Sequence, residues 1–176
     1  MKITLNTFEM ADVERLVSWI DTPEVLHEWA GLMFSFPFTI DQARKYQATS
    51  ADPLARRRIF KVVNSKTGDV VGHIELSHIW FHLSGRISRV LVGRPDDRGR
   101  GIGTAMVTML ASMAFSEFEF HRLDVGVTIG NAQAIACYER AGFGHVGTWA
   151  DAMTTPTGVI DVYWMSLFAP TAVTRP

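Results

Sequence analysis

The 176-residue sequence has a single cysteine, Cys137, so it cannot form an internal disulfide bond. It has no apolar run as long as a membrane span, because the longest candidate, residues 104–115, is too short and is interrupted by Thr108 and Ser112. Its N-terminus lacks the basic segment followed by an apolar segment that is typical of a secretory signal. These absences predict a cytoplasmic protein that does not associate with a membrane.

An excess of charge of either sign is also lacking. Lysine and arginine together number 17, aspartate and glutamate 18, and the formal net charge is −1. This balance does not favour nucleic acid as a partner, and any anion-binding site must therefore be local. The six histidines show no zinc-ligand spacing, so no metal site is expected.

The pattern of apolar residues predicts an α/β (α+β) fold in one domain. Three consecutive strands joined by short turns predict an antiparallel meander, and a strand–helix–strand unit over residues 86–128 predicts parallel neighbours. The expected architecture is a mixed, mostly antiparallel twisted sheet with helices on both faces. Strands are expected over residues 1–8, 59–64, 70–79, 86–92, 123–128, 143–149 and 159–168, and helices over 12–20, 25–29, 39–52, 103–118 and 131–141.

Residues 98–103, Arg-Gly-Arg-Gly-Ile-Gly, form a glycine-rich loop between a predicted strand and a predicted helix. The first N–H groups of a helix lack intrahelical partners and lie at the positive end of the helix dipole. Glycines let the preceding backbone curl around an anion, and Arg98 and Arg100 add positive charge. The loop predicts a pyrophosphate site, although a plain connecting turn has the same composition. It matches neither a P-loop nor the dinucleotide-binding fingerprint.

A second motif covers residues 131–143. Asn131 is a favourable helix N-cap, and Gly142 stands where a left-handed residue ends a helix. Asn131 and Tyr138 are seven residues apart, so they lie on nearly the same helical face. A helix of this kind can line a cofactor site.

Together the two motifs resemble those of the GNAT superfamily of N-acetyltransferases. Residues 98–103 are similar to its Gln/Arg-x-x-Gly-x-Gly/Ala motif, and residues 131–143 to its Asn-x-x-Ala-x-x-x-Tyr-x-x-x-Gly-Phe pattern. Residues 10–25 look like the RimJ/RimL-like branch. The resemblance implies the GNAT fold, with a splayed parallel strand pair. It implies a single domain, 1–176, made of acceptor-side helices (1–55), an acyl-CoA-binding core (58–143) and a C-terminal strand pair (143–168).

The resemblance also implies direct transfer of an acetyl group from acetyl-CoA to a primary amine in a ternary complex. The acceptor is expected to be a protein N-terminus or lysine, or a small amine such as an amino acid, a polyamine or an aminoglycoside. The family commonly forms homodimers. A non-catalytic acyl-CoA-binding or sensing module, and a phosphate-binding domain for ATP or NAD, are the alternatives. The residues expected to bind the cofactor are Val90, Leu91, Val92, Arg98, Gly99, Arg100, Gly101, Ile102, Gly103, Thr104, Asn131 and Tyr138.

Tyr138 is the expected acid that protonates the leaving thiolate, with a packing role as the alternative. Glu75, in the apolar run over residues 70–79, is the expected general base, with an outward-facing glutamate as the alternative. His73 has the same strand parity, so both side chains are expected on one face. His27 and Glu28 are weaker candidates for the base. The residues expected to line the acceptor pocket are Glu28, Trp29, Phe34 and Phe36, although the aromatic residues equally suit a structural role in their loop.

Overall fold

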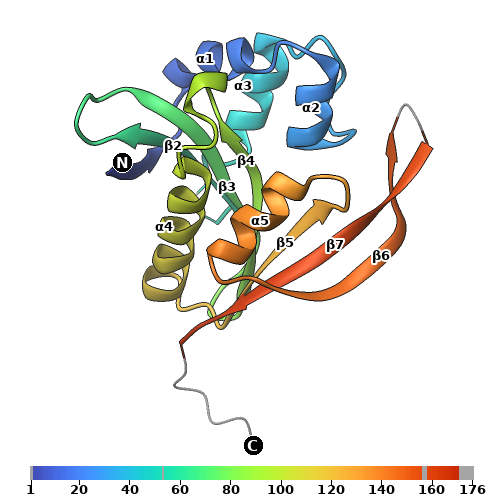
Figure 1. The fold of residues 1–176 in the computed structure, drawn as a ribbon. Coiled ribbons are helices and arrows are strands. Elements are labelled where there is room, and N and C mark those ends of the chain that lie inside the picture. The colour runs from blue at the N-terminus through green and yellow to red at the C-terminus, as the bar shows by residue number, and fades with distance from the viewer. Residues whose placement is uncertain (1, 53, 156–157, 171–176) are drawn as a thin grey trace, which may run out of the picture.

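A computed structural model describes residues 2–52, 54–155 and 158–170 of the chain. Seven strands form one sheet in the order β1-β2-β3-β4-β5-β7-β6 (Figure 1). The strands are β1 (Ile3–Thr7), β2 (Arg57–Asn64), β3 (Val70–Trp80), β4 (Ser84–Val92), β5 (Arg122–Thr128), β6 (Gly144–Thr155) and β7 (Gly158–Phe168). The helices are η1 (Met10–Asp12), α1 (Val13–Trp19), α2 (Pro23–Ala30), α3 (Ile40–Ala48), η2 (Pro95–Asp97), α4 (Ile102–Glu117) and α5 (Ala132–Arg140).

The sheet is mixed, as the sequence predicted. Strands β1 to β4 are joined in antiparallel order, and β5, β7 and β6 form a second antiparallel group. The two groups meet through the parallel pair β4–β5, whose register covers Ser84–Arg86 against Arg122–Asp124. Both strands continue past this short ladder, so a gap opens between their carboxyl-terminal halves.

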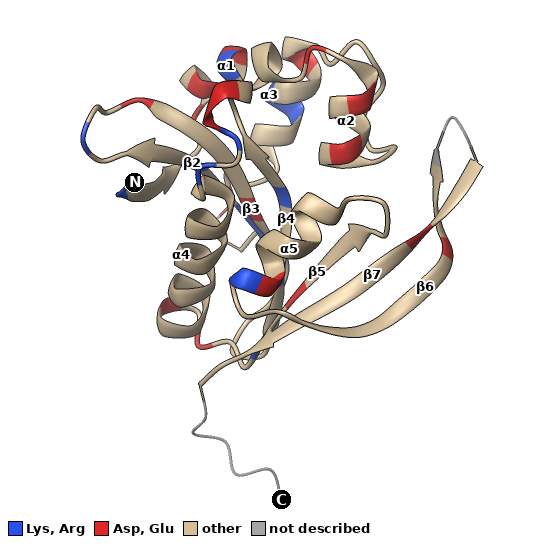
Figure 2. Ribbon diagram, viewed as in Figure 1, with Lys and Arg blue, Asp and Glu red and all other residues tan. Residues whose placement is uncertain are grey.

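Helices cover both faces of the sheet, which the sequence also predicted (Figure 1). Helix α4 packs on one face through Met106, Leu110 and Ala114, all fully buried. It carries one charged residue, Glu117 at its last position, and its exposed face is formed by the uncharged polar residues Thr108, Ser112 and Ser116 (Figure 2). Helices α1 to α3 form a smaller core on the other face, centred on Leu16, Trp29 and other buried apolar residues.

Several predicted boundaries differ from the structure. Strand β4 begins at Ser84 rather than at residue 86, and α3 ends at Ala48 rather than near residue 52. Strand β6 extends to Thr155, although the sequence indicated a strand only to residue 149. The second half of β6 contains small and polar residues, so its sequence lacks the apolar–polar alternation that is typical of a strand. This half is strand because it pairs with β7 beyond a bulge. The resulting hairpin extends beyond the rest of the sheet (Figure 1).

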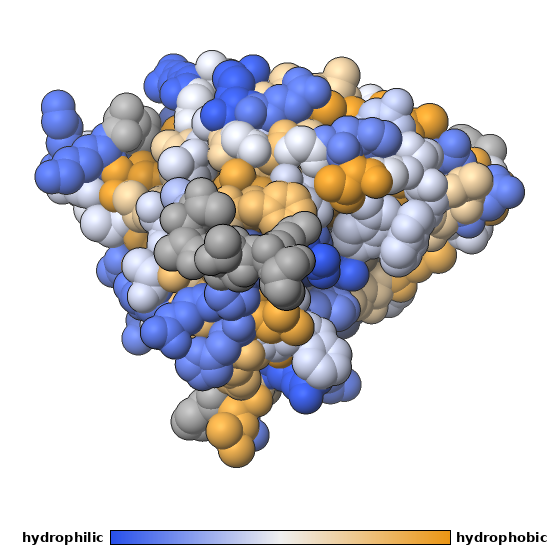
Figure 3. Space-filling view, turned by 90° about the horizontal axis from the view of Figure 1, so that it is seen from below, coloured by the Kyte–Doolittle hydropathy of each residue, from blue (hydrophilic) through white to orange (hydrophobic). Residues whose placement is uncertain are grey.

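The surface is mixed in character. On the face seen from below, apolar and polar side chains are interspersed (Figure 3). Within the described ranges, no helix is both long and apolar enough to cross a membrane. Nor do the described residues include a group of three or more His, Cys, Asp or Glu side chains that is placed to hold a metal ion.

Candidate active site

The loop between β4 and α4 has the backbone geometry of an anion cradle. Gly99 and Gly101 have φ angles of 73° and 80°, in the left-handed region that favours glycine. No atom lies within 4 Å of a Cβ built at either position, so the backbone conformation, and not space, requires glycine there. Gly101 is the N-cap of α4, and no side chain caps this helix end. The first N–H groups of α4 are therefore available to an anion.

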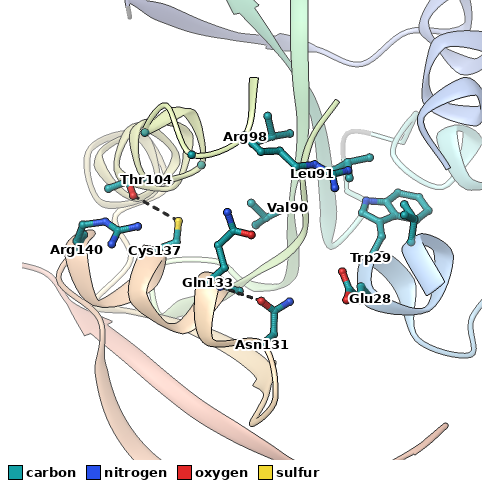
Figure 4. A pocket seen from close by; sticks show the side chains of 16 residues that line it. Glu28, Trp29, Val90, Leu91, Arg98, Thr104, Asn131, Gln133, Cys137 and Arg140 are labelled. Atoms are coloured by element: carbon teal, nitrogen blue, oxygen red, sulfur yellow. Dashed lines mark hydrogen bonds between the residues drawn. The ribbon is translucent and has the colours of Figure 1, made fainter. Parts of the chain in front are cut away.

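A cavity of about 400 Å³ adjoins this loop (Figure 4). Arg98 lies in its wall, whereas Arg100 does not line it and forms an ion pair with Asp97 at 3.7 Å. Ile102 is 2% exposed and belongs to the core beneath α4. The residues that line this cavity are Val25, Glu28, Trp29, Val90, Leu91, Val92, Arg98, Gly99, Gly101, Gly103, Thr104, Asn131, Gln133, Ala134, Cys137 and Arg140.

Helices α4 and α5 pack closely along one side of the cavity. The Thr104 hydroxyl donates to Cys137 Sγ at 3.6 Å, and a Cβ at Gly103 would lie 3.3 Å from the same sulfur. Asn131 caps α5, because its Oδ1 accepts from the N–H of Ala134 at 3.0 Å (Figure 4). The capping bond uses the Asn131 oxygen and leaves its amide nitrogen for a ligand in the cavity.

A second cavity, of about 380 Å³, lies between α2, α5 and the strands β3 to β7. It shares five lining residues with the first, and these stand where β4 and β5 diverge: Glu28, Trp29, Val90, Asn131 and Ala134. In Figure 4 the Glu28 and Trp29 side chains from α2 face Gln133 and Asn131 from α5. The two cavities thus meet at the gap in the sheet.

Tyr138 is 7% exposed and lines the second cavity rather than the first. Its ring packs edge-on against Phe143 at 6.1 Å. Burial, and to a smaller extent the neighbouring Cys137, raises the pKa of the Tyr138 phenol well above its ordinary value of 10.0. The phenol is therefore fully protonated near neutral pH and can act as a proton donor.

Glu75 is fully buried behind the second cavity and lines neither cavity. Its carboxylate accepts from the Tyr46 hydroxyl at 2.6 Å and pairs with Arg57 Nε at 3.0 Å and with the Arg89 guanidinium. His73 lies on the same face, as the strand alternation predicted, with Nε2 3.2 Å from the Tyr46 hydroxyl. The carboxylate is thus enclosed by cations and hydrogen-bond donors instead of opening toward a substrate.

This buried cluster fixes a bulge in β4. The register between β3 and β4 shifts across Arg89, which has a φ angle of 50°. The Arg89 carbonyl accepts from Trp29 Nε1 at 3.1 Å and lies 3.0 Å from His73 Nδ1. Burial lowers the pKa of His73 to about 4, so the ring is neutral near pH 7. Arg89 and Val90 stand outside the paired register, at the place where the cavities meet.

The sequence-predicted acceptor residues separate into two groups. Glu28 and Trp29 line both cavities. Phe34 lines neither but stacks on Trp29 at 5.8 Å, and Phe36 is 46% exposed and also lines neither. Sequence reasoning missed several residues of the second cavity and its supporting cluster, namely Tyr46, Arg57, Arg86, Arg89, Trp149 and Trp164. The available signal in the sequence was the presence of two charged residues, Arg86 and Arg89, inside the predicted strand 86–92.

Comparison with known proteins agrees with this geometry. Residues 24–143 match the acetyltransferase (GNAT) family, so the chain belongs to that family. The chain is accordingly an acetyl-CoA-dependent N-acetyltransferase, the enzyme class that the sequence predicted.

Particular relatives include the aminoglycoside N(6')-acetyltransferase type 1 of Klebsiella pneumoniae, 25% identical over an alignment covering 89% of this chain and 79% of the relative. The spermidine N(1)-acetyltransferase of Vibrio cholerae is 22% identical over 81% of this chain and 79% of its own. The crystal structure of the Vibrio cholerae spermidine N-acetyltransferase in complex with CoA and spermine superposes with a TM-score of 0.80 at 21% identity, covering 94% of this chain and 95% of that one. This likeness confirms the predicted GNAT fold.

Proposed function

We propose that this protein transfers an acetyl group from acetyl-CoA to the primary amine of a small molecule, by direct attack in a ternary complex. The observation that carries the proposal is the pair of cavities that meet at the β4–β5 gap. One cavity adjoins an anion cradle suited to the CoA pyrophosphate, and the other is bounded by the β6–β7 hairpin and is open to an acceptor. A thioester bound at the junction is then accessible to the amine from the second cavity, while the rest of CoA occupies the first.

The residues present fit CoA. The uncapped start of α4 and the Arg98 side chain suit a pyrophosphate, and the gap beside Val90 to Val92 suits a pantetheine arm that extends the β4 edge. Arg89 and Val90 stand outside the paired register, and we assign to the backbone N–H groups at this bulge the role of stabilising the oxyanion.

In the transfer step the amine nitrogen bonds to the thioester carbon, and the carbon–sulfur bond breaks. Tyr138, kept protonated by burial, donates its proton to the departing thiolate, and the proton that the nitrogen loses after attack restores the phenol. The amine must lose a proton before or during attack. Glu28 is the carboxylate that lines both cavities, and we assign it the role of holding the ammonium and accepting this proton. Glu75 then acts by positioning Arg57, Arg89 and the β4 bulge.

The acceptor is assigned to small amines because the relatives named above are acetyltransferases of aminoglycosides and spermidine. The RimJ/RimL-like branch, a protein acceptor, a homodimer and a cytoplasmic location stay predictions from the sequence.

Calorimetric titration of the purified protein with acetyl-CoA, with ATP and NAD as controls, tests the proposal. Selective binding of acetyl-CoA, followed by release of free thiol when a primary amine is added, is the expected result. Binding of acetyl-CoA without thiol release from any amine in a broad panel would indicate a non-catalytic acyl-CoA-binding module. Preferential binding of ATP or NAD would contradict the assignment of the loop.

A further inference from the structure

The acceptor cavity contains buried polar groups that the described protein residues leave unsatisfied. Four side-chain nitrogens of residues lining this cavity are buried without a hydrogen-bond partner: His27 Nε2, Arg86 Nε, Arg89 Nε and Trp164 Nε1. Three of the four, on Arg86, Arg89 and Trp164, can only donate. Buried donors are normally paired, so the protein supplies too few hydrogen-bond acceptors along this wall of the cavity.

Arg86 is the most distinctive of these residues. Its guanidinium lies 4.4 Å above the ring of Trp164, which also contacts Trp149 at 4.6 Å. Burial lowers the pKa of Arg86, and Asp124, whose charge acts in the opposite direction, forms no ion pair with it. The two Asp124 oxygens are held by Ser166 at 2.6 Å and Arg122 at 3.1 Å. Arg86 thus presents a charge in the cavity without a carboxylate of the described residues paired to it.

The charge of the cavity is opposite to that expected for a polycation site. Three arginines line it, and Glu28 is its single carboxylate among the described residues. Glu75, which lies behind the wall of this cavity, neutralises one of the two positive charges of Arg57 and Arg89. The positive charge of Arg86 has no such partner in the part of the chain that the structure describes. The other acidic residues in or next to helices η1 to α3 line neither cavity, among them Asp12, Glu14, Asp21, Glu24 and Asp41. Repulsion from Arg86 therefore disfavours an acceptor with several positive charges.

We infer that the acceptor is a small primary amine that also carries a carboxylate. Its ammonium group lies beside Glu28, at the junction of the cavities, and its carboxylate accepts from the Arg86 guanidinium, which lies over the Trp164 ring. Trp149, Met153 and Val162 supply apolar walls for the body of the molecule between its two charged ends. The inference rests on the proposed function, because it concerns the acceptor side of the same site.

Thiol release from acetyl-CoA tests the inference with matched acceptor pairs. A series of ω-amino acids of increasing chain length is compared with the corresponding ω-amino carboxamides, together with spermidine and kanamycin. The carboxylate should raise kcat/KM by about 10-fold or more at the best chain length, the range of a charge-assisted hydrogen bond. The carboxamide keeps the amine and the body and removes only the negative charge.

The variant Arg86→Gln should abolish this preference and leave the KM for acetyl-CoA unchanged. Arg44→Gln, an exposed arginine on α3 that lines neither cavity, is the matched control and should retain the preference. Arg86→Lys keeps the positive charge and should therefore retain part of the preference for the carboxylate. This variant separates the effect of losing the charge from an effect of misfolding.

The inference is overturned if wild-type protein acetylates the carboxamides, spermidine or kanamycin as well as the amino acids, or if the preference survives Arg86→Gln. In either case the proposed function stands. Absence of acetyl-CoA binding, measured separately by calorimetry, would instead remove the proposed function and this inference with it.

Discussion

Replacement of Glu75 by glutamine tests the role of the buried cluster beneath the β4 bulge. The substitution keeps the size of the side chain and one oxygen for the Tyr46 hydroxyl. It removes the negative charge that faces Arg57 and Arg89, whose side chains are 23% and 7% exposed. The Glu75 carboxylate is the ion-pair partner of both guanidinium groups, so Arg89 in particular would remain buried with its charge uncompensated.

Removing one partner of a buried ion pair destabilises a protein by about 3–5 kcal/mol. We expect the lower end, about 3 kcal/mol, because Arg57 is partly exposed and can turn toward water. For a domain of 176 residues this corresponds to a fall in Tm of about 6–12 °C, at roughly 2–4 °C per kcal/mol. The free energy of unfolding should fall in parallel.

Urea and thermal unfolding followed by circular dichroism measure this effect. Glu28→Gln is the matched control, because Glu28 is an exposed carboxylate at the cavity junction, and its Tm should stay within about 2 °C of wild type. A wild-type Tm for Glu75→Gln would refute the stabilising role of the cluster. The pH profile of kcat, measured below the unfolding temperature, separates a positioning role of Glu75 from a role as general base. Loss of its lower limb in Glu75→Gln would restore Glu75 as the general base that the sequence indicated.

Three further predictions concern other parts of the site. Tyr138→Phe should lower kcat in the thiol-release assay by about 100-fold or more with an unchanged Kd for acetyl-CoA, and equal turnover would remove Tyr138 from the mechanism. Gly101→Ala and Gly68→Ala, with φ angles of 80° and 78°, should each lower stability by about 1 kcal/mol. In calorimetry only Gly101→Ala should weaken acetyl-CoA binding, and an equal effect of Gly68→Ala would contradict a cradle at the loop. The pKa of His73 is about 4 in the folded state and 6.5 in the unfolded state, so the folded state binds fewer protons between these two pH values. The contribution of neutral His73 to stability is therefore fully present above pH 6.5. The free energy of unfolding should fall by about 3 kcal/mol as the pH drops from 6.5 to 4. The slope of unfolding free energy against pH should be flatter in His73→Gln, and an unchanged slope would assign the acid sensitivity to other groups.

The sequence alone was sufficient for the family and the sheet, and it predicted most of the residues that line the cavity beside the glycine loop. These features depend on short-range patterns: alternating apolar residues in strands, the glycine loop that precedes a helix, and the Asn131 cap of the following helix. Such patterns are local because each is enforced by backbone hydrogen bonding and glycine conformation within a few residues.

The second cavity and the buried cluster behind it were decided by tertiary structure. Glu75 was predicted as a base because a carboxylate in an apolar strand suggests chemistry, yet its partners Tyr46, Arg57 and Arg89 come from α3, β2 and β4. The stacking of Arg86 on Trp164 likewise joins residues 78 positions apart. No local pattern records such pairings, because the free energy of a buried charge depends on which groups the fold brings around it.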